Sequence, residues 1–133
     1  MNVQTFASQV GLSAHTLRYY EKIGLLTQVK RRANGHRYFD EADVRWISFI
    51  LRLKETGMAL ADMVHYAQLR AAGDATLAQR QALLSLHAQQ LQAEIASKQQ
   101  DLAKLQDKIA WYDALLQQLA APENPVASSK QPA

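Results

Sequence analysis

The sequence predicts a mainly α-helical protein in which a small head domain is followed by one long helical arm. Three observations predict this arrangement. Apolar residues recur at helical spacing through the first 70 residues, a basic stretch with an Asn-Gly turn interrupts these helices, and an unbroken heptad pattern follows Thr76. With 133 residues, of which 48% are hydrophobic, the chain can form one compact domain and an appendage rather than two full cores.

Composition restricts the possible functions. The chain has no cysteine, which excludes disulfides, thiolate metal sites and thiol redox sensing. Its four histidines have no metal-binding spacing, and no nucleophile–base pair is recognisable, so we expect no metal, no cofactor and no enzymatic activity. No apolar run approaches the roughly 20 residues of a membrane span, and the N-terminus lacks a signal-peptide pattern, so a cytoplasmic location is expected.

The excess positive charge lies in the first half of the chain. Residues 1–60 contain nine Lys and Arg against five Asp and Glu, a net charge of +4. Residues 61–133 contain six against seven, a net charge of −1. A polyanion would therefore bind the first half.

Two short helices joined by a tight turn begin the chain. Asn2 can cap a helix that ends near Val10, Gly11 turns the chain, and Ser13 can cap a second helix over residues 14–23. This pattern predicts a helix-turn-helix. A generic αα-corner in a small bundle is the alternative.

The second helix presents a polar, cationic face at positions i, i+3, i+4 and i+7. Arg and Lys can reach phosphates or guanine edges, Tyr can donate to phosphate, and Thr near the helix start can touch a base edge. The alternative is a solvated face whose cations pair with Glu21. The residues of this helix predicted to contact DNA are Ser13, His15, Thr16, Arg18, Tyr19 and Lys22.

A basic hairpin follows the second helix. Asn34-Gly35 between two β-capable arms predicts a tight turn, because both residues can adopt positive φ. Four of the residues from 30 to 37 are Lys or Arg. Since a two-stranded ribbon is marginal alone, we expect it to lean on the helices as a wing and to place its cations beside the second helix.

Two further helices complete the head, which we place at residues 1–70. Asp40 can cap a third helix that reaches about Thr56, and Gly57 can terminate it. A fourth helix is expected from Leu60 to about Leu69. The core residues expected from the third helix are Val44, Trp46, Ile47, Ile50, Leu51 and Leu53.

The arm carries the heptad pattern. Eleven positions from Leu84 to Leu119 alternate steps of four and three, and Lys98 alone among them is neither apolar nor aromatic. A helix of about 65 Å cannot bury this stripe against a 70-residue domain, so residues 76–120 are expected to dimerise, with the orientation of the two helices left open. Residues 121–133 are expected to be a disordered tail. The predicted dimer contacts are Leu84, Leu91, Ile95, Leu102, Leu105, Ile109, Tyr112 and Leu116.

These motifs closely resemble those of the MerR family of bacterial transcription regulators. The matching stretches are Ala7-Ser-Gln-Val-Gly-Leu-Ser13, Thr16-Leu-Arg-Tyr-Tyr-Glu-Lys-Ile-Gly-Leu-Leu26, Asn34-Gly-His-Arg-Tyr38 and Thr56-Gly-Met-Ala-Leu60. The stretch from Gly73 to Leu84 and the later Lys108-Ile-Ala-Trp-Tyr112 resemble a subgroup whose members sense aldehydes or other electrophiles.

The resemblance implies a winged helix-turn-helix DNA-binding domain on a homodimer whose long helices form an antiparallel coiled coil. It also implies that the protein bends and untwists promoter DNA so that RNA polymerase can engage two promoter elements. By position, Arg18 and Tyr19 would contact the DNA groove and backbone, and Arg37 and Tyr38 would hold the wing on phosphate. The supporting cations would be Lys22, Lys30 and Arg31.

The chain also departs from the family pattern. His36 replaces the usual Tyr, Ala59 replaces the usual helix-capping residue, and no cysteine lies in the third helix or near the end of the arm. The triggers of electrophile-sensing and metal-sensing relatives therefore cannot be transferred to this chain.

The resemblance suggests a possible effector pocket, and other functions remain open. In an antiparallel dimer Trp111 and Tyr112 would approach Met63 and Tyr66 of the second copy, where a small apolar effector could bind. Alternatively, the two aromatics simply anchor the arm. The competing functions are an architectural DNA-bending protein of the excisionase type and a coiled-coil adaptor with an incidental basic head.

Overall fold

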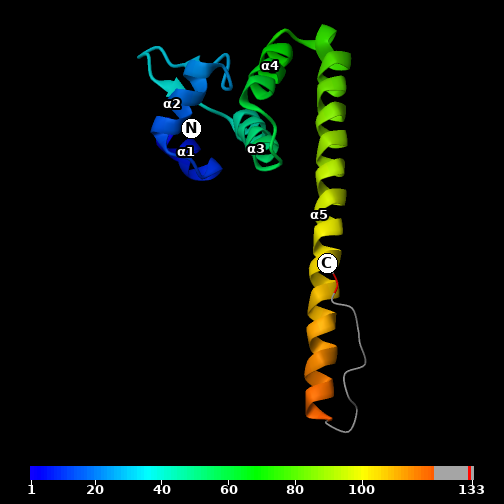
Figure 1. Cartoon of the computed structure of the whole chain (residues 1–133). Coiled ribbons are helices and arrows are strands. Elements are labelled where there is room, and N and C mark those ends of the chain that lie inside the picture. Colours follow the sequence, from blue (N-terminus) through cyan, green and yellow to red (C-terminus); the bar gives the residue numbers. More distant parts are fainter. Residues whose placement is uncertain (122–131, 133) are drawn as a thin grey trace. The chain divides into compact units, whose positions relative to one another are not determined.

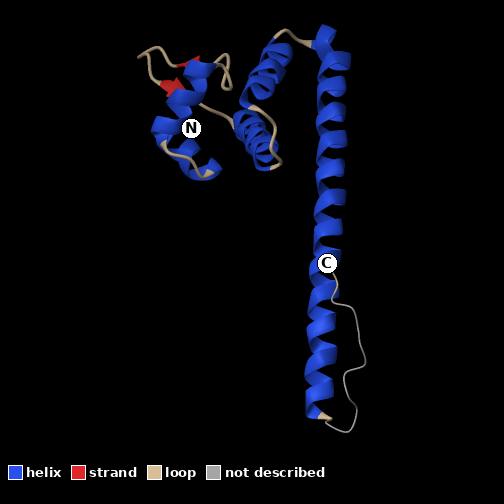
Figure 2. Cartoon of the chain, viewed as in Figure 1, coloured by secondary structure: helices blue, strands red, loops and turns tan. Residues whose placement is uncertain are grey.

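The protein is described by a computed structural model that covers residues 1–121 and 132. It is mainly helical, and its two short strands form one hairpin (Figures 1 and 2). The elements in chain order are α1 (Val3–Val10), α2 (Ala14–Ile23), β1 (Lys30–Arg31), β2 (Arg37–Tyr38), α3 (Glu41–Glu55), α4 (Leu60–Ala71), a 3₁₀ turn (Asp74–Thr76) and α5 (Leu77–Ala120). The predicted mainly α architecture with a wing and a long final helix is confirmed.

Contacts within the chain define two units. The first, Met1–Gln89, contains the hairpin, the first four α-helices and the start of α5; we call it the head. The second begins at Gln90 and contains the rest of α5; we call it the arm. The tail expected at residues 121–133 lies, apart from Ala121 and Pro132, outside the described residues. Within the described chain no helix is both long and apolar enough to cross a membrane.

Side-chain caps set the starts of the first three helices. Asn2 Oδ1 accepts from the Thr5 amide at 2.9 Å, and Ser13 Oγ accepts from the Thr16 amide at 3.1 Å. At α3, Asp40 and Asp43 cap each other's amides reciprocally, at 3.1 and 3.0 Å. All three predicted caps are confirmed, and α2 has the predicted bounds because Gly24 adopts a left-handed φ of 91° at its end.

The head is built around one apolar core. The most completely buried large side chains come from α1, α2, α3 and the loop after α2, and they are Phe6, Leu17, Leu25, Ile47 and Ile50. Trp46 is also buried, and its Nε1 donates to the Leu25 carbonyl at 2.8 Å. The Phe6 and Phe39 rings stack at 4.2 Å, which joins the end of the wing to α1. Val44 and Leu51, expected in the core, are half-buried and pack against it.

The wing turn differs from the expected two-residue turn. The Arg32 amide donates to the His36 carbonyl at 2.8 Å, and the Gly35 amide donates to the Arg32 carbonyl at 2.9 Å. Of the two predicted turn residues only Gly35 has a positive φ, of 85°, so the expectation for Asn34 is wrong. Asn34 Oδ1 instead accepts from the His36 amide at 3.0 Å, and the loop has three residues ending in a left-handed glycine.

The second half of the head differs from the prediction at the end of α4. This helix runs two residues beyond the expected Leu69, and the 3₁₀ turn Asp74–Thr76, which was not predicted, joins it to α5. Ala59 stands at the start of α4 without a side-chain cap, as expected. His87 on α5, which appears isolated in the sequence, lies with its Nε2 2.7 Å from Thr56 Oγ1 at the end of α3. This hydrogen bond holds the start of α5 against the end of α3.

Candidate nucleic-acid interface

The exposed face of α2 carries the predicted polar side chains. Arg18, Tyr19 and Lys22 are exposed, whereas Leu17 and Tyr20 on the opposite side are buried in the core. Ser13 and His15 are also exposed at the start of the helix. The Ser13 and Thr16 hydroxyls lie 2.9 Å apart and hydrogen-bond each other. The face is therefore available for contact while its geometry is fixed by the buried side.

Glu21 on α2 holds the wing against the helix. Arg37 Nε donates to Glu21 Oε2 at 2.6 Å, and Arg31 Nη2 lies 3.5 Å from Glu21 Oε1. Both partners of the shorter contact are largely shielded from solvent, which favours a strong charge-assisted hydrogen bond. The alternative expectation was that Glu21 pairs with the cations of its own helix. In the structure the Glu21 carboxylate instead pairs with Arg31 and Arg37 of the wing.

A second ion-pair cluster fixes the base of the wing. The Lys30 ammonium donates to Asp40 and lies 3.7 Å from Asp43, the two residues that form the α3 cap. The hydrogen bond from Lys30 and that from the Asp43 amide lower the pKa of Asp40 to about 2. The same hydrogen bond raises the pKa of Lys30. The wing therefore has one anchor on α2 and another on α3.

The predicted DNA-binding cations consequently fall into two groups. Lys30, Arg31 and Arg37 are paired with carboxylates, so phosphate would have to share or replace those partners. Arg18 and Lys22 form no ion pair within the described part of the chain. Arg32, which was not among the predicted contacts, is also exposed and unpaired there; its guanidinium lies 5.2 Å from the Tyr38 ring centroid. The sequence signal that could have identified Arg32 as a DNA contact is its position in the basic run Lys30–Arg32.

A polar groove joins the recognition helix to the tip of the wing. It has a volume of about 430 Å³ and is lined by Arg18 of α2, by Arg37 and His36 of the wing, and by the start of α1. Asn2, which caps α1, and Gln4 of α1 line the same groove, and sequence reasoning missed both. Because amide side chains and cations face one hollow, the site suits a polyanionic backbone flanked by polar groups.

Family models match most of the chain. A model described as "MerR HTH family regulatory protein" matches residues 1–69, and one described as "MerR, DNA binding" matches residues 44–110. The chain belongs to the MerR family. It is a DNA-binding transcriptional regulator, and the matched families and relatives are regulators rather than enzymes.

Two relatives illustrate how far the similarity of this MerR-family chain extends. It is 41% identical over 91 residues to the HTH-type transcriptional regulator AdhR of Bacillus subtilis, a match that covers 68% of this chain and 65% of AdhR. It is 38% identical over 106 residues to an HTH-type transcriptional regulator of Haemophilus influenzae, covering 80% of this chain and 78% of the relative.

Solved structures extend the similarity to the fold. A MerR family regulator from Listeria monocytogenes has a TM-score of 0.82, with 34% identity and 92% of each chain covered. HiNmlR, described as a MerR family regulator lacking the sensor domain and bound to promoter DNA, has a TM-score of 0.74 with 35% identity, covering 85% of this chain and 90% of that one.

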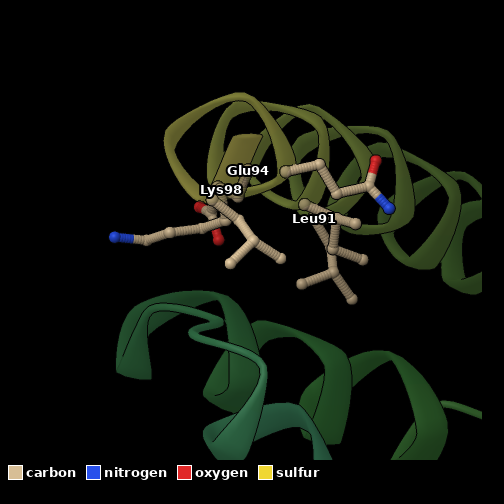
Figure 3. A pocket seen from close by; sticks show the side chains of 6 residues that line it. Leu91, Glu94 and Lys98 are labelled. Atoms are coloured by element: carbon tan, nitrogen blue, oxygen red, sulfur yellow. The ribbon is translucent and has the colours of Figure 1, made fainter. Parts of the chain in front are cut away.

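The predicted dimer contacts of this MerR-family protein lie mostly on exposed parts of α5. Leu105 and Ile109 are 63% and 67% exposed. Figure 3 shows the side chains of Leu91, Glu94 and Lys98 beside an apolar hollow of about 500 Å³ on the same helix. Leu84 differs from the others, because it packs against the core of the head.

The residues suggested for an effector pocket do not share one cavity in the head. Met63 is buried and lines a cavity with Tyr19 and Lys54, whereas Tyr66 lines a different cavity with Trp46. Trp111 and Tyr112 belong to the arm, where their rings pack edge to face at 4.8 Å. Among residues 1–121 and 132 no cluster of His, Asp or Glu could hold a metal ion.

Proposed function

We propose that the protein binds promoter DNA as a homodimer and controls transcription by distorting the DNA between two promoter elements. The observation that carries this proposal is the combination of a basic winged head with an arm whose apolar seam is exposed. Each copy supplies one DNA-binding surface, and the seam provides the means of joining two.

In the DNA complex α2 enters the major groove and the wing follows the adjacent backbone. Arg18 and Tyr19 contact base edges and phosphate, supported by Lys22, and Ser13, His15 and Thr16 lie at the leading end of the helix. Arg37 has a second role as a positioning residue, because its bond to Glu21 holds the wing beside α2. Lys30, Arg31 and Tyr38 then meet phosphate from a wing that is already oriented.

The homodimer forms through the seam of α5. Each buried Leu or Ile side chain contributes about 1.5–3 kcal/mol, so burial of the exposed seam favours association strongly. Lys98 argues for antiparallel helices, because a parallel, in-register pair would place two Lys98 ammonium groups together inside the seam. In an antiparallel pair, Lys98 of one copy lies opposite Leu102 of the other. In the same register, Ile95 of one copy faces Leu105 of the other, and Glu94 of one copy lies near Lys108 of the other.

Two heads joined through paired helices present two DNA-binding surfaces, and DNA bound by both must match their separation. DNA whose binding sites do not match that separation is bent or untwisted on binding, and the cost depends on its sequence. A regulator that changes the alignment of two promoter elements acts through the DNA on RNA polymerase, which is the further partner of the proposal. The structure of the similar protein HiNmlR bound to promoter DNA supports the part of the proposal that concerns promoter binding.

A hydroxyl-radical footprint on the DNA that flanks the protein's own gene tests the proposal, recorded with and without RNA polymerase. We expect a symmetric footprint between two promoter elements, with altered cleavage at its centre. An Arg18→Ala variant is the matched control and should lose the protection. An asymmetric footprint of the size expected for one head would overturn the homodimer. A symmetric footprint with unaltered cleavage at its centre would overturn the distortion of the DNA.

A further inference from the structure

The head has a second basic surface that the DNA-binding face does not include. It is a cavity of about 290 Å³ between α3, α4 and the first turn of α5, and we call it the arginine cleft. Its lining includes Arg45, Arg70 and Arg80 together with the aromatic residues Trp46, Phe49 and Tyr66. All six lie within Met1–Gln89, so the cleft belongs to the head alone.

The three arginines carry charge that no carboxylate balances within the described residues. The ion pairs found there all involve Glu21, Asp40 or Asp43, and none includes an arginine of the cleft. Arg45 and Arg70 are exposed and Arg80 is half-buried. Three positive charges beside one hollow attract an anion.

Two of the guanidiniums are held in place by neutral contacts. Arg80 Nε donates to Thr76 Oγ1 at 3.1 Å, and Arg80 Nη2 donates to the Gly73 carbonyl at 3.1 Å. These bonds use two of its five N–H groups and leave the others for a ligand. The Arg70 guanidinium lies 4.2 Å from the Trp46 ring centroid, a cation–π contact that fixes its plane.

The aromatic wall defines the shape of a ligand. Trp46 and Tyr66 stack with centroids 5.7 Å apart and planes inclined by 11°, and Phe49 meets Tyr66 at 5.8 Å. Trp46 is 6% exposed and lies under Arg70, whereas Phe49 and Tyr66 are half-buried and can contact a flat ring while its charged group reaches the guanidiniums. The volume lies at the lower end of the range of small-molecule pockets, which limits the ligand to about one ring.

We propose that the arginine cleft binds a small organic anion that carries a single planar ring and a carboxylate. The ring packs on Phe49 and Tyr66, and the carboxylate accepts hydrogen bonds from the arginines. This site is independent of the DNA-binding surface, and its binding can be measured without DNA.

Tryptophan fluorescence provides a direct test, because the chain has two tryptophans and one of them lines the cleft. A Trp111→Phe variant leaves Trp46 as the sole reporter. We expect benzoate to change its fluorescence saturably, with a Kd below about 1 mM, and the neutral isostere benzamide to bind at least roughly tenfold more weakly. Isothermal titration of the unmodified protein with both compounds gives the same comparison without any substitution.

Variants locate the site. Arg45→Gln should weaken benzoate binding at least roughly tenfold, whereas Arg52→Gln, an exposed arginine of the same helix outside the cleft, should leave it unchanged. Equal binding of benzoate and benzamide, equal effects of the two variants, or no saturable binding would overturn the proposal.

Discussion

The head and the arm differ in where their apolar side chains lie. The head encloses a core in which Phe6 and Ile47 are fully buried, whereas no residue of α5 is buried although the helix runs for 44 residues. A domain with its own core can fold alone, but an amphipathic helix of this length gains most of its stability from packing against another surface. The comparison separates a head that has its own core from a helix whose apolar seam is exposed, and the proposed function assigns DNA binding to the first and dimerisation to the second.

The largest expected effect comes from breaking the arm while sparing the head. Leu105→Glu combined with Ile109→Glu places unpaired charge opposite apolar seam residues and should yield monomers by analytical ultracentrifugation. DNA affinity should fall on the order of 100-fold, because two heads no longer bind together. Near-ultraviolet circular dichroism should show an intact head.

The matched control adds the same charges outside the seam. Gln100→Glu with Ala103→Glu should remain dimeric, since both positions lie off the heptad stripe. Monomers in the control, or dimers in the seam variant, would show that the seam is not the interface.

The next effect breaks the head while sparing the arm. Arg18→Ala should weaken DNA binding roughly tenfold to a hundredfold, because a base or phosphate contact contributes about 1–3 kcal/mol. The slope of log affinity against log salt should become less negative by about 1.8 for the dimer, because each of its two heads loses one contact, if the contact is to phosphate. Lys104→Ala on the arm is the control for charge and should change neither quantity, as measured by fluorescence anisotropy.

A smaller effect is expected from replacing Lys98, the one charged residue of the seam. Lys98→Leu completes the apolar seam and should lower the dimer dissociation constant at least roughly tenfold, because one apolar side chain in place of a partly buried ammonium adds about 1.5–3 kcal/mol. The control variant Lys104→Leu makes the same Lys-to-Leu substitution at a position outside the seam. Sedimentation equilibrium should separate the two variants, and an equal response would contradict the heptad assignment.

The smallest effect concerns the base of the wing. The Lys30 hydrogen bond lowers the folded pKa of Asp40 to about 2 from its ordinary 3.8, so its stabilisation is present above the ordinary pKa and is lost as pH falls towards 2. Asp40→Asn keeps a capping side chain but removes the charge. The Tm of the wild type should exceed that of the variant at pH 6, and the difference should shrink as the pH falls below 3.8 and through about 2. A constant difference across this range would exclude the ion pair as its cause.

The helices of the head were predictable because their signals are local. Ser13 and Gly24 directly flank α2 in the sequence, and the Asp40 cap lies one residue before α3. The wing turn was only partly predictable, since Asn34-Gly35 is compatible with more than one hairpin loop and only Gly35 adopts positive φ. The 3₁₀ turn at Asp74–Thr76 has no periodic signal and was missed.

The polar contacts of the candidate site depended on the fold. Glu21 meets Arg37 across 16 residues of chain, so no spacing rule could assign this pair. Met63 and Tyr66 share a helix face by spacing, yet packing against different neighbours places them in separate cavities. The arginine cleft combines residues from three helices, which sequence order does not bring together.

The central claim is that two heads are joined by antiparallel arms, and disulfide cross-linking tests it most directly because the chain has no cysteine of its own. Ile95→Cys and Leu105→Cys variants are oxidised separately and as a mixture that has exchanged subunits. The account predicts a covalent dimer in the mixture and none in either variant alone. Cross-linking of Ile95→Cys with itself, and no additional product in the mixture, would contradict it and indicate parallel arms.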